Sequence, residues 1–142
     1  MPDPQRPLVY SCSGCSNVAQ LANTLAVRLD RAGLAEMSCI AGVGGRVSSL
    51  VKKANSGRPI LAIDGCQLQC VRGCLDQHGV TANVHLVLSQ YGLKKRYGED
   101  CSAEDAEELY QEVCQLIASD RMQVQPAPEA PSSGKRRLRS VK

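Results

Sequence analysis

The sequence contains no phenylalanine and no tryptophan, although 43% of its 142 residues are hydrophobic. Because these large aromatic side chains are missing, Leu, Val, Ile and Ala must fill the core. The chain also lacks an apolar run of the roughly 18 residues that a membrane-spanning helix requires, so we expect no membrane span. Its N-terminus, MPDPQRPLVY, has prolines and an aspartate where a secretory signal would have basic residues and a long apolar segment. We therefore expect a cytoplasmic protein.

Charge is distributed unevenly along the chain. Residues 1–121 carry 12 Lys and Arg against 13 Asp and Glu, whereas residues 122–142 carry 5 basic residues against one glutamate. The length suits one domain, which we assign to residues 1–121. Residues 122–142 are rich in Pro, Ala, Ser and Gly before a basic cluster, so we expect a disordered basic tail. The cluster could contact nucleic acid phosphates, but we favour a terminus without a fixed partner; its residues are Lys135, Arg136, Arg137 and Arg139.

Apolar runs that are typical of strands alternate with segments of helical periodicity. Strands are predicted at 7–11, 35–42, 59–64 and 83–89, and helices at 17–33, 45–57, 66–78 and 103–120. This alternation predicts a parallel sheet with right-handed crossovers. Strands that are apolar throughout agree, because such strands are covered on both faces. We therefore predict an α/β fold, a three-layer sandwich of the Rossmann or flavodoxin-like kind with about four strands in the order 2-1-3-4.

Eight cysteines are present, and in a reducing cytosol clustered cysteines more often bind metal or do redox chemistry than form structural disulfides. Cys12 follows the first predicted strand, Cys39 lies near the end of the second, and Cys66 follows the third. Sites in α/β sheets lie at the carboxyl ends of the strands, so these thiols should meet at one edge. Cys70 adds a fourth thiol one predicted helical turn after Cys66, where Cβ atoms lie roughly 6 Å apart. These four cysteines are a suitable ligand set for tetrahedral zinc.

The remaining cysteines near this edge have other interpretations. Cys74 would lie about 12 Å from Cys66 along the predicted helix axis, too far to share one ion unless the helix is broken. We interpret it as a core thiol or a secondary redox partner. Cys15 forms a Cys-x-x-Cys motif with Cys12, which is typical of thioredoxin-like redox sites. It could also replace Cys39 among the metal ligands, since Cys39 taken alone could equally be a small buried hydrophobe.

Asp64 and Gly65 directly precede Cys66. The carboxylate could orient a metal ligand by a hydrogen bond or cap the following helix, and the sequence does not separate the two roles. The glycine would allow the backbone to approach a thiolate closely and donate an N–H to it. His78, near a helix end, and His85, inside a strand, are predicted to lie away from the site.

Two segments could bind anions. GVGGR, residues 42–46, could form a backbone nest assisted by Arg46, but it lacks the spacing of a dinucleotide-binding or Walker motif. YGLKKRYG, residues 91–98, places Lys94, Lys95 and Arg96 near the same edge as the thiols. For this second segment we favour a solvated surface loop over a binding site for an anionic substrate.

Four segments in one order, YSCSGCSNVAQLAN, MSCIAGVGG, AIDGCQLQC and YGLKKRYGED, together resemble the DGC-domain family. This family is named after its Asp-Gly-Cys motif and is described as zinc-binding. The resemblance spans roughly residues 8–118. It implies four chelating cysteines, which in this chain fall on Cys12, Cys39, Cys66 and Cys70. Cys15 and Cys74 look like additions in this member, and the resemblance implies metal binding without a defined reaction or substrate.

The sequence thus predicts a zinc-binding protein whose four-cysteine site is structural, sensory or metal-handling. A closed site leaves no position for a water nucleophile, so zinc-dependent hydrolysis is disfavoured. One alternative is a thiol-redox or sulfur-handling enzyme that uses Cys12 with Cys15, or Cys70 with Cys74, as an exchanging pair. Another is an iron–sulfur protein that uses the same four cysteines. Whether the protein is an enzyme stays open.

Overall fold

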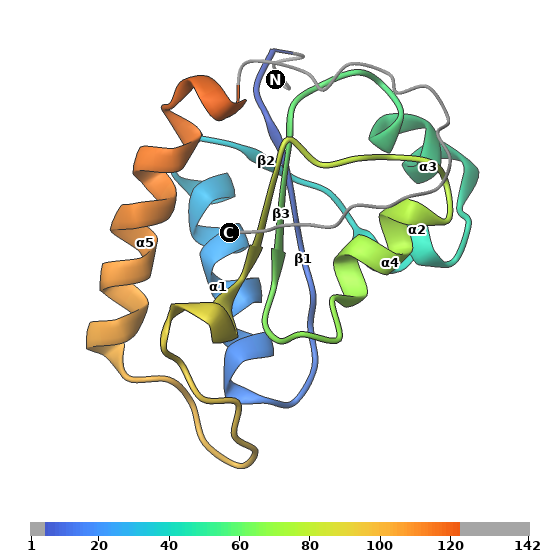
Figure 1. Ribbon diagram of the computed structural model, residues 1–142. Coiled ribbons are helices and arrows are strands. Elements are labelled where there is room, and N and C mark those ends of the chain that lie inside the picture. Colours follow the sequence, from blue (N-terminus) through green and yellow to red (C-terminus); the bar gives the residue numbers. More distant parts are fainter. Residues whose placement is uncertain (1–4, 123–142) are drawn as a thin grey trace.

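A four-stranded parallel sheet forms the centre of the molecule in the computed structural model, which describes residues 5–122 (Figure 1). Its strands are β1 (Leu8–Ser11), β2 (Glu36–Met37), β3 (Ile60–Asp64) and β4 (Val84–Val87), in the order β2-β1-β3-β4. All three pairings are parallel. The predicted α/β sandwich and its strand order are confirmed.

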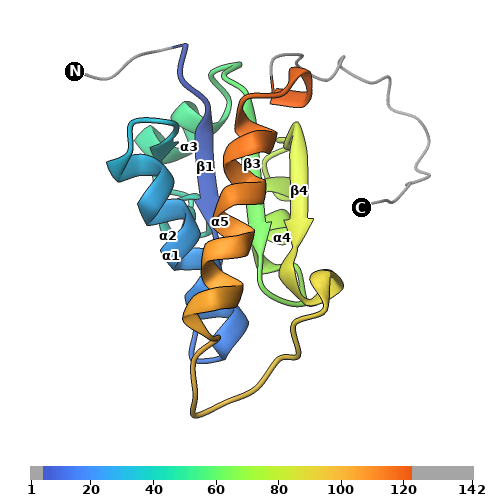
Figure 2. The ribbon, with the colours of Figure 1, turned by 90° about the vertical axis from the view of Figure 1, so that its left-hand side faces the viewer.

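Helices cover both faces of the sheet (Figure 1). One layer contains α1 (Asn17–Arg31) and α5 (Ala103–Ile117), which lie side by side in front of the strands in Figure 2. The other layer contains α2 (Ile40–Gly44), α3 (Ser48–Ala54) and α4 (Cys70–Asp76). Two short 3-10 helices, η1 (Leu88–Tyr91) and η2 (Asp120–Met122), follow β4 and α5.

Aliphatic side chains fill the space between the layers, as the composition requires. Every residue of β1 and β3 is buried, which explains why these strands read as uninterrupted apolar runs. Leu21, Leu25 and Leu29 of α1 pack into the same core at helical spacing. Tyr10 of β1 is the largest of the fully buried side chains and the nearest substitute for the missing phenylalanine and tryptophan.

Two predicted elements are shortened in ways that affect cysteines. The predicted strand 35–42 is cut to Glu36–Met37, because Cys39 becomes the N-cap of α2 and its Sγ accepts the N–H of Gly42. The predicted helix 66–78 begins only at Cys70, because Gln69 adopts a left-handed conformation with φ of 55°. The assumption that Cys66 and Cys70 share one helix is therefore wrong.

The residues that the structure describes extend one residue past the predicted domain boundary at residue 121. Met122, placed in the tail by the sequence prediction, is 1% exposed and packs into the core. Residues 123–142, with the basic cluster, fall outside the residues that the structure describes. Within residues 5–122, none of the helices has the length and hydropathy needed to cross a membrane.

Candidate functional site

Cys12 and Gly65 meet at the carboxyl edge of the sheet, at the lower end of β1 and β3 in Figure 1. The pairing of these strands continues one residue past β1, since the Cys12 N–H donates to the Ile63 carbonyl at 3.1 Å. The Gly65 N–H in turn donates to Cys12 Sγ at 3.2 Å. The predicted approach of this glycine to a sulfur atom is therefore observed.

The Cys12 thiol is buried and surrounded by other acidic groups. Burial raises the pKa of Cys12 to about 11, the Gly65 N–H opposes this rise, and Asp64, Cys70 and Cys66 add to it. Cys66 and Cys70 therefore lie in the neighbourhood of Cys12. In the metal-free chain Cys12 is a neutral thiol at pH 7 and hence a weak nucleophile, which disfavours it as the attacking member of a redox pair with the exposed Cys15.

Cys66 lies on the turn before α4, where a lysine approaches it. Lys95 Nζ is 3.4 Å from Cys66 Sγ, so a positive charge stands beside the thiol. The loop at residues 91–98, the basic loop, therefore reaches the edge of the sheet where the cysteines lie. Its Lys95 contacts Cys66, one of the predicted metal ligands.

Asn17, the first residue of α1, holds this basic loop in place. Its Oδ1 accepts the Arg96 N–H at 2.7 Å, and its Nδ2 donates to the Lys94 carbonyl at 2.9 Å. The Asn17 N–H also donates to the Arg96 carbonyl. Nothing in the sequence around residue 17 indicates a partner near residue 95.

Asp64 is 1% exposed and its carboxylate has three partners. It accepts the N–H groups of Val71 at 2.8 Å and Arg72 at 3.3 Å, and it hydrogen-bonds His85 Nε2 at 2.8 Å. The first two bonds cap α4, whose first residue is Cys70. The two predicted roles of Asp64 are therefore compatible, since capping this helix also fixes the backbone that carries Cys70.

The prediction that His85 lies away from the site is wrong. The β3–β4 register pairs His85 with Ala62, two residues before Asp64. Residues two apart on a strand point to the same face, so His85 and Asp64 face the helices of the α4 layer together. His78 lies elsewhere, with its Nε2 2.8 Å from the Val43 carbonyl at the far end of α2.

Cys39 directly precedes α2, and Cys74 lies on α4. Cys39 is exposed, and its Sγ accepts the Gly42 N–H at 3.3 Å. Burial raises the pKa of Tyr10 on β1, and Cys39 adds a smaller contribution, so Cys39 lies near β1 as well. Cys74 packs against Gly44, where an added Cβ would come within 2.9 Å of its sulfur.

The thiols do not yet surround a common point. Within residues 5–122, no three His, Cys, Asp or Glu side chains are arranged to hold a metal ion. Cys66 and Cys70 both contribute to the raised pKa of Cys12, while Cys39 occupies the start of α2. Ligation of one ion by all four would require rotation of these side chains.

Comparison with known protein families identifies the family of this chain. The model described as the DGC domain matches residues 8–113, from β1 into α5. This chain belongs to the DGC domain family. A Pseudomonas aeruginosa (strain PAO1) relative of this DGC domain, named anaerobic and virulence modulator AnvM, is 69% identical over 116 residues, which cover 82% of this chain and 88% of the relative. No solved structure matches the chain.

Each residue of the Asp-Gly-Cys segment in this DGC domain has a separate structural role. Asp64 caps α4 through the Val71 and Arg72 N–H groups. Gly65 packs directly on the backbone of α1, where an added Cβ would lie 2.7 Å from the Val18 carbonyl carbon. Cys66 then presents a thiol beside Lys95. The segment therefore brings together a helix start, a close backbone contact and a candidate ligand.

Proposed function

We propose that this DGC domain binds one zinc ion through the thiolates of Cys12, Cys39, Cys66 and Cys70. The main support is that thiols from three separate loops gather at one sheet edge with hydrogen-bond donors already aimed at their sulfur atoms. The Gly65 N–H points at Cys12 and the Gly42 N–H at Cys39. Such N–H groups stabilise thiolates and tune the metal that they hold.

The donor set itself fits zinc. All four candidate ligands are sulfur, and four thiolates are a common tetrahedral environment for structural zinc. Four thiolates around a divalent ion leave a net negative charge, and Lys95 beside Cys66 supplies a compensating cation. The zinc ion would cross-link the loops after β1, β2 and β3. An iron–sulfur cluster would use the same ligands, and the metal analysis below distinguishes the two.

Untagged protein is expected to contain one zinc per chain by elemental analysis and to be colourless. Cys12→Ser should lower zinc occupancy to below about a tenth, because a neutral hydroxyl replaces a metal-binding thiolate. Cys15→Ser is the matched control, since Cys15 is exposed and lies three residues away; it should retain its zinc.

Equal loss of zinc in Cys12→Ser and Cys15→Ser would show that the proposed quartet is wrong. A brown protein that contains iron would show that the site holds an iron–sulfur cluster and not zinc. Cys39→Ser tests the fourth ligand separately: full zinc occupancy in that variant would remove Cys39 from the ligand set.

We further propose that the site has a sensory role. The relative's name links that protein to anaerobic modulation, and we extend this link to the present chain. Cys39 and Cys70 are exposed, so an oxidant can reach them. A peroxide would take two electrons from two thiolates, forming one disulfide and, with two protons, two molecules of water; the zinc ion would then lose two ligands.

Hydrogen peroxide is expected to release the bound zinc, and a thiol reductant should restore binding. A chromogenic zinc indicator measures the release, and mass spectrometry locates the disulfide. The Cys15→Ser control should release zinc at the same rate as the unmodified chain. Retention of zinc while other thiols become oxidised would contradict the sensory role and leave zinc binding itself intact.

A further inference from the structure

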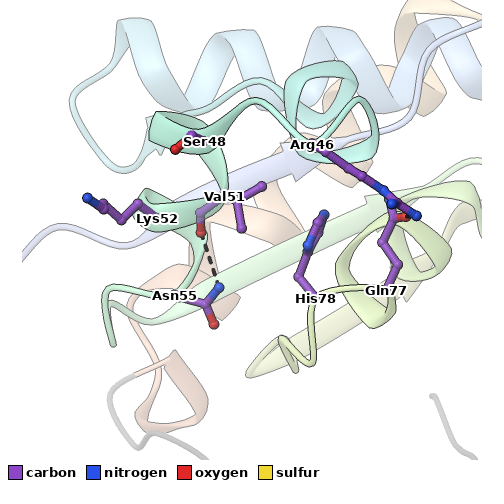
Figure 3. Close-up of a pocket in the computed structure, with 7 residues that line it drawn as sticks. All are labelled: Arg46, Ser48, Val51, Lys52, Asn55, Gln77 and His78. Atoms are coloured by element: carbon purple, nitrogen blue, oxygen red, sulfur yellow. Dashed lines mark hydrogen bonds between the residues drawn. The ribbon is translucent and has the colours of Figure 1, made fainter.

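A pocket of about 600 Å³ lies in the helical layer formed by α2, α3 and α4 (Figure 3). Arg46 and Gln77 line one side of it, residues of α3 line the other, and His78 lies between them (Figure 3). Its volume is within the range of small-molecule sites in proteins. None of the eight cysteines lines it, so the pocket is separate from the proposed zinc site.

Two cations in this pocket have no carboxylate partner among residues 5–122. Arg46 and Lys52 both line it, and none of its described lining residues is acidic. The Arg46 guanidinium donates to the Gln77 amide oxygen at 3.4 Å, and neither cation makes an ion pair within residues 5–122. The adjacent Lys53 differs, because it pairs with Glu36 at 2.6 Å. The positive charge of the pocket is therefore left for an external partner.

The hydrogen bonds of the pocket determine which donors face a ligand. The Gln77 amide group donates to the Gly44 carbonyl at 3.2 Å, and the Asn55 amide group donates to the Val51 carbonyl at 3.2 Å. His78 Nε2 is occupied by the Val43 carbonyl. The Arg46 guanidinium, the Lys52 ammonium and the Ser48 hydroxyl are further donors that line the pocket, so a matching ligand needs several acceptor oxygens.

We propose that this pocket binds a small phosphate-bearing molecule. A phosphate group offers three acceptor oxygens and a negative charge, which suit the planar fork of Arg46 and the mobile charge of Lys52. The sequence prediction of an anion nest at residues 42–46 is corrected in part. Residues 40–44 are helical, so they do not form an open nest, and the anion would contact the Arg46 side chain instead.

Arg46→Gly offers a test that preserves the fold. Arg46 has a φ of 65°, a conformation that glycine adopts without strain, so the melting temperature should not fall. Isothermal titration of the full metal-bearing chain in 150 mM salt with pyrophosphate and with inorganic phosphate should show one saturable site. Arg46→Gly should raise the dissociation constant for pyrophosphate at least tenfold, as expected for loss of a charge-assisted hydrogen bond.

Arg31→Gln is the matched control, since Arg31 is an exposed cation on α1 in the opposite helical layer. It should change the dissociation constant less than twofold, and Cys12→Ser should not change it either. Absence of saturable binding for both phosphate probes would overturn the proposal. Equal weakening by Arg46→Gly and Arg31→Gln would also overturn it, because the binding would then follow net charge alone. Failure of zinc binding with intact pyrophosphate binding would affect only the proposed function.

Discussion

Replacing Gly65 by alanine is expected to destabilise the protein by about 3 kcal/mol or more. A Cβ at this position would lie 2.7 Å from the Val18 carbonyl carbon and 2.8 Å from the Ala19 nitrogen. These are backbone atoms of α1, so they cannot rotate away as a flexible side chain would. Overpacking of a tight core typically costs about 1–3 kcal/mol, and displacement of residue 65 would also weaken its hydrogen bond to Cys12 Sγ. Urea unfolding of the purified variant measures the change.

Gly73→Ala is the control for this substitution. Gly73 lies inside α4, and an added Cβ there would meet no atom within 4 Å. Alanine should therefore stabilise the protein by about 0.5–1 kcal/mol through its higher helix propensity. A Gly65→Ala variant that unfolds at the same urea concentration as the unmodified chain would show that α1 can move away from β3.

Strand order was predictable because burial leaves a clear mark on the sequence. β1 and β3 are buried throughout, so their apolar runs identify central strands. The helix after β3 was less predictable. Its cap is Asp64, six residues before Cys70, and the left-handed Gln69 separates the two. Rules based on residue spacing expect the capping residue directly before the first turn of a helix. They therefore placed the start of this helix at Cys66 and not at Cys70.

Contacts in the candidate site that follow from the strand topology could be predicted. Contacts that depend on the register between β3 and β4 could not. Parallel strands necessarily deliver Cys12 and Gly65 to the same edge, and the two residues are in contact. The His85 contact with Asp64 depends on how β4 pairs with β3. A one-residue slip would point His85 to the other face, and the apolar pattern of β4 alone does not fix this register.

Asp64→Ala is expected to destabilise the metal-free protein by about 3–5 kcal/mol, the usual cost of removing one member of a buried polar network. The substitution would leave the Val71 and Arg72 N–H groups and the His85 ring without their shared acceptor. Asp64→Asn keeps one carbonyl oxygen for the helix cap, so it should cost only about 1–2 kcal/mol. Unfolding of the three proteins after zinc removal by a chelator measures this difference.

Measurement of zinc affinity distinguishes a role of Asp64 in the proposed zinc site from a role in stability alone. Asp64 fixes the backbone that begins with Cys70, so Asp64→Asn should weaken zinc binding about 10- to 100-fold, as loss of a group that supports a metal ligand does. Ser102→Ala is the control, because Ser102 caps the distant α5 through the Asp105 N–H. That change should cost about 1 kcal/mol of stability and leave zinc affinity unchanged in a chelator competition. If Asp64→Asn lowered stability without weakening zinc binding, Asp64 would serve the fold alone, and Cys70 would not depend on it as a ligand.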